Sequence, residues 1–154
     1  MIRPGFNQFK GDALTYFDDL RKPGVIYQDI FESFWIGQHK HEFSPAETVQ
    51  ILTSVADAIK SNCDDDQKIK LRNVISKNWD CWESAAIDHV DFFSTQDCRK
   101  ALNACDDLGI RPSKDFMSCM NRQLKKLSGD FSAHNYSVIF QSMAKIGLDA
   151  PIEL

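Results

Sequence analysis

A short phrase that begins with Phe-Ser recurs three times in this chain, and its spacing restricts the fold more than any other feature. The phrases start at Phe43, Phe93 and Phe131, so that 50 residues separate the first two and 38 the last two. A degraded copy with one deletion precedes them, because Leu14–Pro23 matches Leu102–Pro112. Self-similarity at periods of about 20 to 50 residues predicts a stack of structural repeats.

Each phrase carries the signals of a helix start. A serine follows each phenylalanine, and its hydroxyl can accept a hydrogen bond from a backbone N–H that the helix leaves unpaired. Three residues later, Glu47 and Asp97 are placed to complete a capping box. In the last two copies a glycine and then a proline follow the final apolar position, as expected at a helix end. The serines are Ser44, Ser94 and Ser132, the glycines Gly109 and Gly147, and the prolines Pro112 and Pro151.

An apolar stripe at helical spacing follows in the first three units and predicts a second helix. It runs from Ile26 to Ile36, from Ile69 to Trp82 and from Phe116 to Leu127. We therefore expect seven helices in an all-α fold, an α-solenoid of about three and a half helix-hairpin repeats. The sequence predicts a single domain over 1–154, with units at about 6–42, 43–92, 93–130 and 131–154.

Two of these units depart from the common length. The second is the longest, and we expect its extra residues in the acidic turn Cys63–Asp66 and near Ala85–Asp91. The last has a first helix but no second one, so the apolar side of that helix has no partner within its own unit. This predicts either a fragment of a longer array or a protein partner at the C-terminal end.

The first helix of each unit has an apolar face and a polar face. Counting from each phenylalanine and turning 100° per residue places positions 5, 8, 9 and 12 on one side, which we expect to face the core. Position 11 is small in three units, as a close approach between helices requires: Ser54, Ala104 and Ser142. Position 10 lies opposite the core and is uncharged and polar in every unit: Thr15, Thr53, Asn103 and Gln141. We call these four residues the polar column.

The polar column predicts contacts with RNA bases. Repeat proteins that read one base per unit use such side chains, because a base edge needs a paired donor and acceptor. The candidate RNA-binding residues are Thr53, Asn103 and Gln141 in the column, Gln96, Arg99, Lys100 and His134 beside it, and Arg122, Lys125 and Lys126 on the second helix of the third unit. The arginines and lysines are the candidates for phosphate contacts. The alternative interpretation is an ordinary solvated face, since exposed helix positions are commonly polar.

The third unit resembles the octotricopeptide repeat. The resemblance is carried by Leu108-Gly109 and Pro112, by the apolar second helix, and by the Phe-Ser that opens the next unit 38 residues on. It is close over Leu102–Gly147, fair over Phe43–Ile59 and weak over residues 6–42. The repeats of FAST-kinase-like organellar proteins are similar, more loosely. The resemblance implies an α-solenoid that binds single-stranded RNA or a ribonucleoprotein in organelle gene expression, inside a mitochondrion or plastid. The cytoplasm is the alternative location.

The charge balance favours a different function for the same fold. Net charge is −4, and residues 1–66 hold 6 Lys/Arg against 11 Asp/Glu. A nonspecific nucleic-acid binder is usually clearly basic. The rival hypothesis is therefore a protein–protein scaffold, such as a structural subunit of a large assembly like an organellar ribosome.

The remaining motifs indicate neither catalysis nor a bound cofactor. The five cysteines are odd in number and none forms a C-x-x-C pair, so we expect reduced thiols that act as small core residues. The histidines show no metal-ligand spacing, and no nucleophile or phosphate-loop motif is present. Trp79 and Trp82 lie on an apolar stripe, where a place in the core is favoured over stacking on a base. We expect a protein that is not an enzyme, with no cofactor, no metal and no membrane association.

Overall fold

The computed structural model describes residues 4–20, 28–61 and 63–145, which form eight α-helices and three short 3₁₀ helices, with no strand among them. The all-α prediction is confirmed for this part of the chain. The first helices of the units are α1 (Pro4–Asp19), α3 (Pro45–Ser61), α6 (Thr95–Leu108) and α8 (Ala133–Lys145). The second helices are α2 (Gln28–Gly37), α4 (Asp65–Lys77), α5 (Trp79–Ile87) and α7 (Lys114–Lys126). The 3₁₀ helices η1 (Gln38–Lys40), η2 (Val90–Phe92) and η3 (Ser128–Asp130) each lead into the next first helix.

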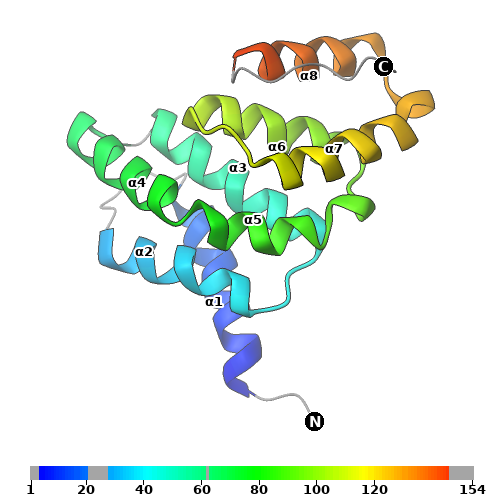
Figure 1. The fold of residues 1–154 in the computed structure, drawn as a ribbon. Helices are drawn as coiled ribbons and strands as arrows, with labels where there is room; N and C mark the ends of the chain where they lie inside the picture. The colour runs from blue at the N-terminus through cyan, green and yellow to red at the C-terminus, as the bar shows by residue number, and fades with distance from the viewer. Residues whose placement is uncertain (1–3, 21–27, 62, 146–154) are drawn as a thin grey trace.

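The helices pack in two layers. In the first layer α1 packs on α3, α3 on α6, and α6 on α8. In the second layer α2 packs on α4 and α5, and α5 packs on α7. Figure 1 shows α4, α5 and α7 in front of α3 and α6, with α1 and α2 at one end of the molecule and α8 at the other. Each first helix therefore lies against the first helix of the next unit along the chain.

The predicted helix starts are present as hydrogen-bonded caps. Ser44 and Ser94 each form a capping box, in which the serine Oγ accepts from the N–H of Glu47 or Asp97 at 3.1 Å and the acid accepts from the serine N–H. Ser132 caps α8 by accepting from the N–H of Asn135 at 3.1 Å. These contacts satisfy N–H groups that the first turn would otherwise leave unpaired.

The predicted end of α6 is present as well. Gly109 follows the helix with a φ of 68°, a left-handed conformation that glycine adopts without steric cost. Gly147 and Pro151, which were expected to end the last unit, lie outside the described residues. The local start and stop signals of the third unit therefore act as the sequence predicts.

The second unit departs from the prediction of a single second helix. Its second helical segment is divided at Asn78, where α4 ends and α5 begins. Asn78 leaves the helical conformation there, with φ −118° and ψ 30°, and its side-chain amide donates to the carbonyl of Val74 at 3.0 Å, which makes a local bond that competes with the regular backbone ladder. The extra residues of this unit therefore lie mainly within α4 and α5, and less in the two turns where we expected them. Eight α-helices, one more than predicted, are present in the described residues.

A chain of aromatic rings joins the units of the second layer. Trp35 of α2 stacks on Phe31 at 6.1 Å and on Trp79 of α5 at 6.4 Å. Trp79 contacts Trp82 at 5.0 Å, and Trp82 contacts Phe116 of α7 at 5.7 Å. Such ring pairs stabilise a core beyond the apolar area that they bury. Trp82 is fully buried and Trp79 is partly buried, so both tryptophans belong to the core, as favoured above.

Small residues join the units of the first layer. Ser54, Ala104 and Ser142, which occupy position 11 of their helices, are all buried. The core positions Cys98, Ala101, Leu102 and Cys105 of α6 are fully buried, as predicted. A small side chain lets two helix backbones approach closely, so α3, α6 and α8 can lie side by side with their polar faces outward. No helix in the described ranges is long and apolar enough to cross a membrane.

Candidate nucleic-acid interface

The polar column lies along the outer side of the first layer. Thr15 of α1, Asn103 of α6 and Gln141 of α8 are exposed. Thr53 of α3 is only partly exposed, and its hydroxyl donates to the carbonyl of Val49 at 2.8 Å. The expectation of an exposed side chain therefore holds for three of the four residues. The hydroxyl of Thr53 keeps only its acceptor function for a ligand, because its proton is already engaged.

The outer face of α6 brings several candidates together. Gln96, Lys100 and Asn103 are exposed on this helix, and Arg99 is partly buried between them. The Nε of Arg99 donates to Oε1 of Gln96 at 3.0 Å, so these two side chains hold each other. The candidate His134 on α8 is exposed too. Residues three and four positions apart share a helix face, so α6 presents an amide, a guanidinium, an ammonium and a second amide in a row.

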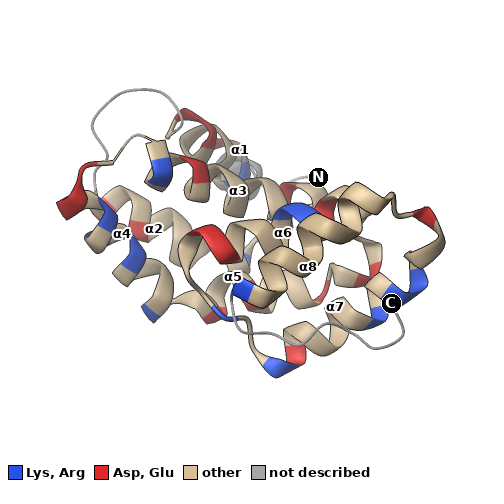
Figure 2. Ribbon diagram, turned by 90° about the horizontal axis from the view of Figure 1, so that it is seen from above, with Lys and Arg blue, Asp and Glu red and all other residues tan. Residues whose placement is uncertain are grey.

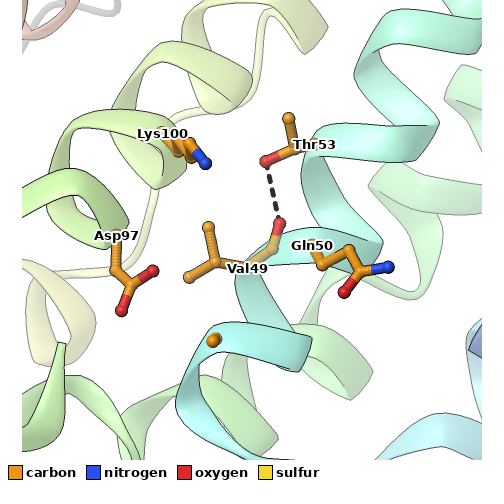
Figure 3. Close-up of a pocket in the computed structure, with 6 residues that line it drawn as sticks. Val49, Gln50, Thr53, Asp97 and Lys100 are labelled. Carbon is orange, nitrogen blue, oxygen red and sulfur yellow. Dashed lines mark hydrogen bonds between the residues drawn. The ribbon is translucent and has the colours of Figure 1, made fainter. Parts of the chain in front are cut away.

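A pocket of about 330 Å³ opens between α3 and α6 beside the column. The α3 wall is formed by Ala46, Val49, Gln50 and Thr53, and the α6 wall by Asp97 and Lys100. Figure 3 shows Lys100 reaching toward the α3 wall, with Val49 between the two helices and the amide of Gln50 turned away. Two sequence candidates, Thr53 and Lys100, thus line one hollow. Asp97 is a wall residue that sequence reasoning treated only as a helix cap.

Acidic residues lie next to the column, and sequence reasoning did not include them. Asp107 pairs with Lys60 of α3 at 3.6 Å, and Asp106 pairs with Lys145 of α8 at 3.7 Å. At the other end of the layer, Lys10 of α1 pairs with Glu47 of α3 at 2.8 Å, and this contact lowers the pKa of the Glu47 carboxyl despite the opposing effect of its partial burial. Neighbouring first helices are therefore joined by ion pairs. These pairs also neutralise lysines that a phosphate would otherwise attract.

Three of the five cations predicted to bind phosphate lie in the other layer. Arg122, Lys125 and Lys126 are exposed on α7, and Arg122 forms an ion pair with Asp91 at 3.2 Å. Figure 2 shows basic residues on α4 and α7, and further ones on the helices of the first layer. The structure therefore separates the ten candidate residues into two groups. Seven belong to the first layer, and the three cations of α7 belong to the second.

No known protein family, curated protein or solved structure matches this chain. The resemblance to octotricopeptide repeats therefore stays a prediction, and the geometry of the chain itself carries the functional argument.

Metal binding and thiol chemistry can be considered for the described residues. No group of three His, Cys, Asp or Glu side chains in these ranges is arranged to hold a metal ion. Burial raises the pKa of the Cys98 thiol to about 12 and raises that of Cys105 as well. Both thiols therefore stay protonated near neutral pH and are poor nucleophiles. Cys98 and Cys105 act as small core residues, as the sequence predicts.

Proposed function

We propose that this chain is a non-enzymatic α-solenoid module that binds single-stranded RNA in organelle gene expression. One observation carries the proposal: uncharged hydrogen-bonding side chains recur at one register on successive, mutually packed helices. Asn103 and Gln141 are exposed on α6 and α8, which pack directly on each other. Packed helices lie about 8–10 Å apart, so adjacent column residues are spaced for successive, unstacked bases.

The chemistry of the column suits the edges of bases. An amide side chain offers a donor and an acceptor together, and it can pair with two atoms of one base edge. In the α3–α6 pocket, the ammonium of Lys100 adds a donor and the Oγ1 of Thr53 adds an acceptor. Recognition of bases by paired contacts gives sequence preference, which a bare row of charges does not give.

Phosphate contacts complete the proposed interface. Arg99 and Lys100 lie on the same helix face as Asn103, which places cations beside the column. The net charge of −4 and the ion-paired lysines of the first layer predict modest affinity that depends on a few phosphate contacts. We therefore expect a weak dependence on salt, well below that of a basic nucleic-acid binder.

A protein–protein scaffold is the second candidate, and the same ion pairs favour it. They engage the ammonium groups of Lys10, Lys60 and Lys145, so these three lysines form no continuous band of unpaired cations on the outer side of the first layer. In this interpretation the column is a solvated or protein-facing surface of a large assembly. A protein partner at the C-terminal end, beside α8, belongs to this second candidate.

Titration of the protein with a panel of short, labelled single-stranded RNAs at about 50 and 200 mM salt separates the two functions. The RNA proposal predicts saturable binding that differs among sequences and weakens with salt. A protein that binds no RNA of the panel at low salt would leave the scaffold as the better interpretation.

A further inference from the structure

Phe92 is an exposed aromatic side chain that neither the fold nor the polar column explains. It is 74% exposed, more than Ile69 at 59% or Ile30 at 44%, the other large exposed hydrophobic residues in the described part of the chain. Its neighbour Phe93 is only 1% exposed and packs in the core. A ring left almost wholly in water gives up the stabilisation that burial would supply, which is about 1.5–3 kcal/mol for a large apolar side chain. The fold itself therefore provides no reason for this ring.

The backbone next to Phe92 contacts α7 on both sides, and a buried hydrogen bond holds one of them. The preceding residue, Asp91, pairs with Arg122 at 3.2 Å. The carbonyl of the following residue, Phe93, accepts a buried hydrogen bond from Nε2 of Gln123 at 2.8 Å. Consecutive residues of α7 thus hold the two residues that flank Phe92. The ring lies exposed at the end of η2, next to α7.

Cations line the adjacent side of this corner. Lys125 and Lys126 follow Arg122 by three and four positions, so the three side chains lie on adjoining turns of α7, and all are exposed. The pair between Arg122 and Asp91 is itself exposed, and exposed pairs contribute little, so Arg122 can exchange Asp91 for another anion. The exposed ring of Phe92 therefore follows directly on Asp91, which contacts Arg122, and Lys125 and Lys126 extend the positive charge along α7.

We infer that Phe92 is a stacking platform for a base of single-stranded RNA, with the neighbouring phosphates held by Arg122, Lys125 and Lys126. Proteins that bind single strands combine these two elements, a basic track for the backbone and an aromatic ring for a base. The inference rests on the proposed function, and it gives the second layer a role in that function. It also gives the α7 cations a role, although they lie away from the polar column.

The surroundings of Phe92 favour a nucleic acid over a protein partner at this corner. Protein interfaces centre on a buried apolar cluster in which charged residues are depleted. The residues that the structure places here are instead Asp91, Arg122, Lys125 and Lys126, all exposed and charged. A base needs only one ring face and a nearby cation, and this corner supplies both.

The test compares substitutions that keep or remove the ring, with labelled oligouridine and oligoadenosine RNAs of about 12 nucleotides as probes. Phe92→Trp keeps an aromatic face, Phe92→Leu keeps an apolar side chain without one, and Ile69→Ala is a matched control on another exposed residue. We expect Phe92→Leu to weaken binding by about 5- to 150-fold. Phe92→Trp should bind at least as well as the unmodified protein, and Ile69→Ala should bind like it. The salt dependence should be unchanged in Phe92→Leu and reduced in Lys126→Ala.

The outcomes separate the two proposals. If the unmodified protein binds these RNAs but Phe92→Leu binds equally well, the stacking role is overturned and the proposed function stands. If the unmodified protein binds neither RNA, the stacking role is overturned, because stacking tolerates any base, and the proposed function is then decided by the RNA panel. Equal weakening in Phe92→Leu and Ile69→Ala would show a general effect of exposed apolar area and would also overturn the stacking role. Circular dichroism of each variant checks that the helices are intact, which the exposure of Phe92 leads us to expect.

Discussion

The two helix layers of this protein hold their units together by different means. In the first layer, small residues such as Ala104 let helices approach closely, and ion pairs join their outer sides. In the second layer, a chain of aromatic rings runs from Phe31 to Phe116 through three tryptophans. The comparison teaches that two kinds of contact hold the same fold. Aromatic rings join the second helices of different units, whereas the first helices pack through aliphatic and small residues and keep their polar side chains on the outer side.

Trp82→Ala gives the largest expected effect, because it breaks the aromatic chain between α5 and α7. Trp82 is fully buried, and its Nε1 donates to the carbonyl of Thr48 at 2.9 Å, which links the two layers. Truncation of a buried aromatic residue costs about 3–5 kcal/mol in the free energy of unfolding. Denaturant unfolding followed by circular dichroism measures this loss in the free energy of unfolding. Trp82→Phe, which keeps a ring but loses the donor, serves as the control and should lose less. Equal stability of Trp82→Ala and the unmodified protein would contradict the assignment of the aromatic chain as the main link between units.

Ala104→Leu tests the first layer in the same way and should cost less. Ala104 is 2% exposed on α6, which packs on both α3 and α8. Three extra carbon atoms at a tight contact force the helices apart, at a cost of about 1–3 kcal/mol. The matched control is Asn103→Leu, which adds apolar volume at the neighbouring exposed position. A loss of stability in Asn103→Leu as large as in Ala104→Leu would show that position 11 is not the close contact.

Much of this architecture could be predicted from the sequence because its signals are local. A capping box such as Ser94 with Asp97 depends on residues three apart, and the left-handed end at Gly109 depends on a single residue. The burial of position 11 and the exposure of Asn103 follow from helical periodicity within one helix. The break at Asn78 was missed because the apolar stripe continues across it, and only the non-helical backbone of Asn78 and its side-chain bond to Val74 reveal the end.

The candidate site was harder to predict because it depends on neighbouring helices. The ion pairs of Asp106 and Asp107 join helices whose relative position a single sequence does not give. In the sequence, Phe92 and Phe93 are two adjacent apolar residues with nothing to distinguish them. Only the fold determines which of the two rings is buried. The sequence likewise offered no sign that the α7 cations and the polar column would lie in different layers. Periodicity predicts which face of one helix is exposed, but it does not predict what lies beside that face.

Asn103→Ala tests whether the polar column of the first layer recognises RNA bases. A paired contact between an amide and a base edge discriminates by about 1–3 kcal/mol, so this variant should bind the preferred RNA less well and lose preference at one nucleotide. Lys125→Ala should instead weaken all RNAs alike and reduce the salt slope by about one unit. Binding isotherms across the RNA panel measure both effects. Because Asn103 is exposed, the midpoint of denaturant unfolding should be the same in Asn103→Ala and in the unmodified protein. Identical sequence preference in Asn103→Ala and the unmodified protein would remove the base-reading role from the column.

A small effect on stability is expected from the double substitution Asp106→Asn with Asp107→Asn. Both acids pair with lysines across helix boundaries, but the lysine side chains are 57% and 68% exposed, so each pair contributes only about 0.2–1 kcal/mol to folding. Denaturant unfolding should therefore show a minor loss.

The same double variant should change RNA binding in the opposite direction, and this is where the two candidate functions differ most. Removal of the acids frees Lys60 and Lys145 on either side of Asn103, where a phosphate backbone following the polar column would pass. If the chain binds RNA along this face, affinity should rise, and the salt slope should steepen by about 0.7 for each lysine that a phosphate then neutralises. The asparagines keep the size and polarity of the acids, so a change in slope reports charge and not packing. If the first layer instead faces a protein partner, the substitutions leave RNA affinity negligible at both salt concentrations. A variant that binds RNA with the same affinity and the same slope as the unmodified protein would place the RNA path away from α6 and leave the corner at Phe92 as the remaining contact surface.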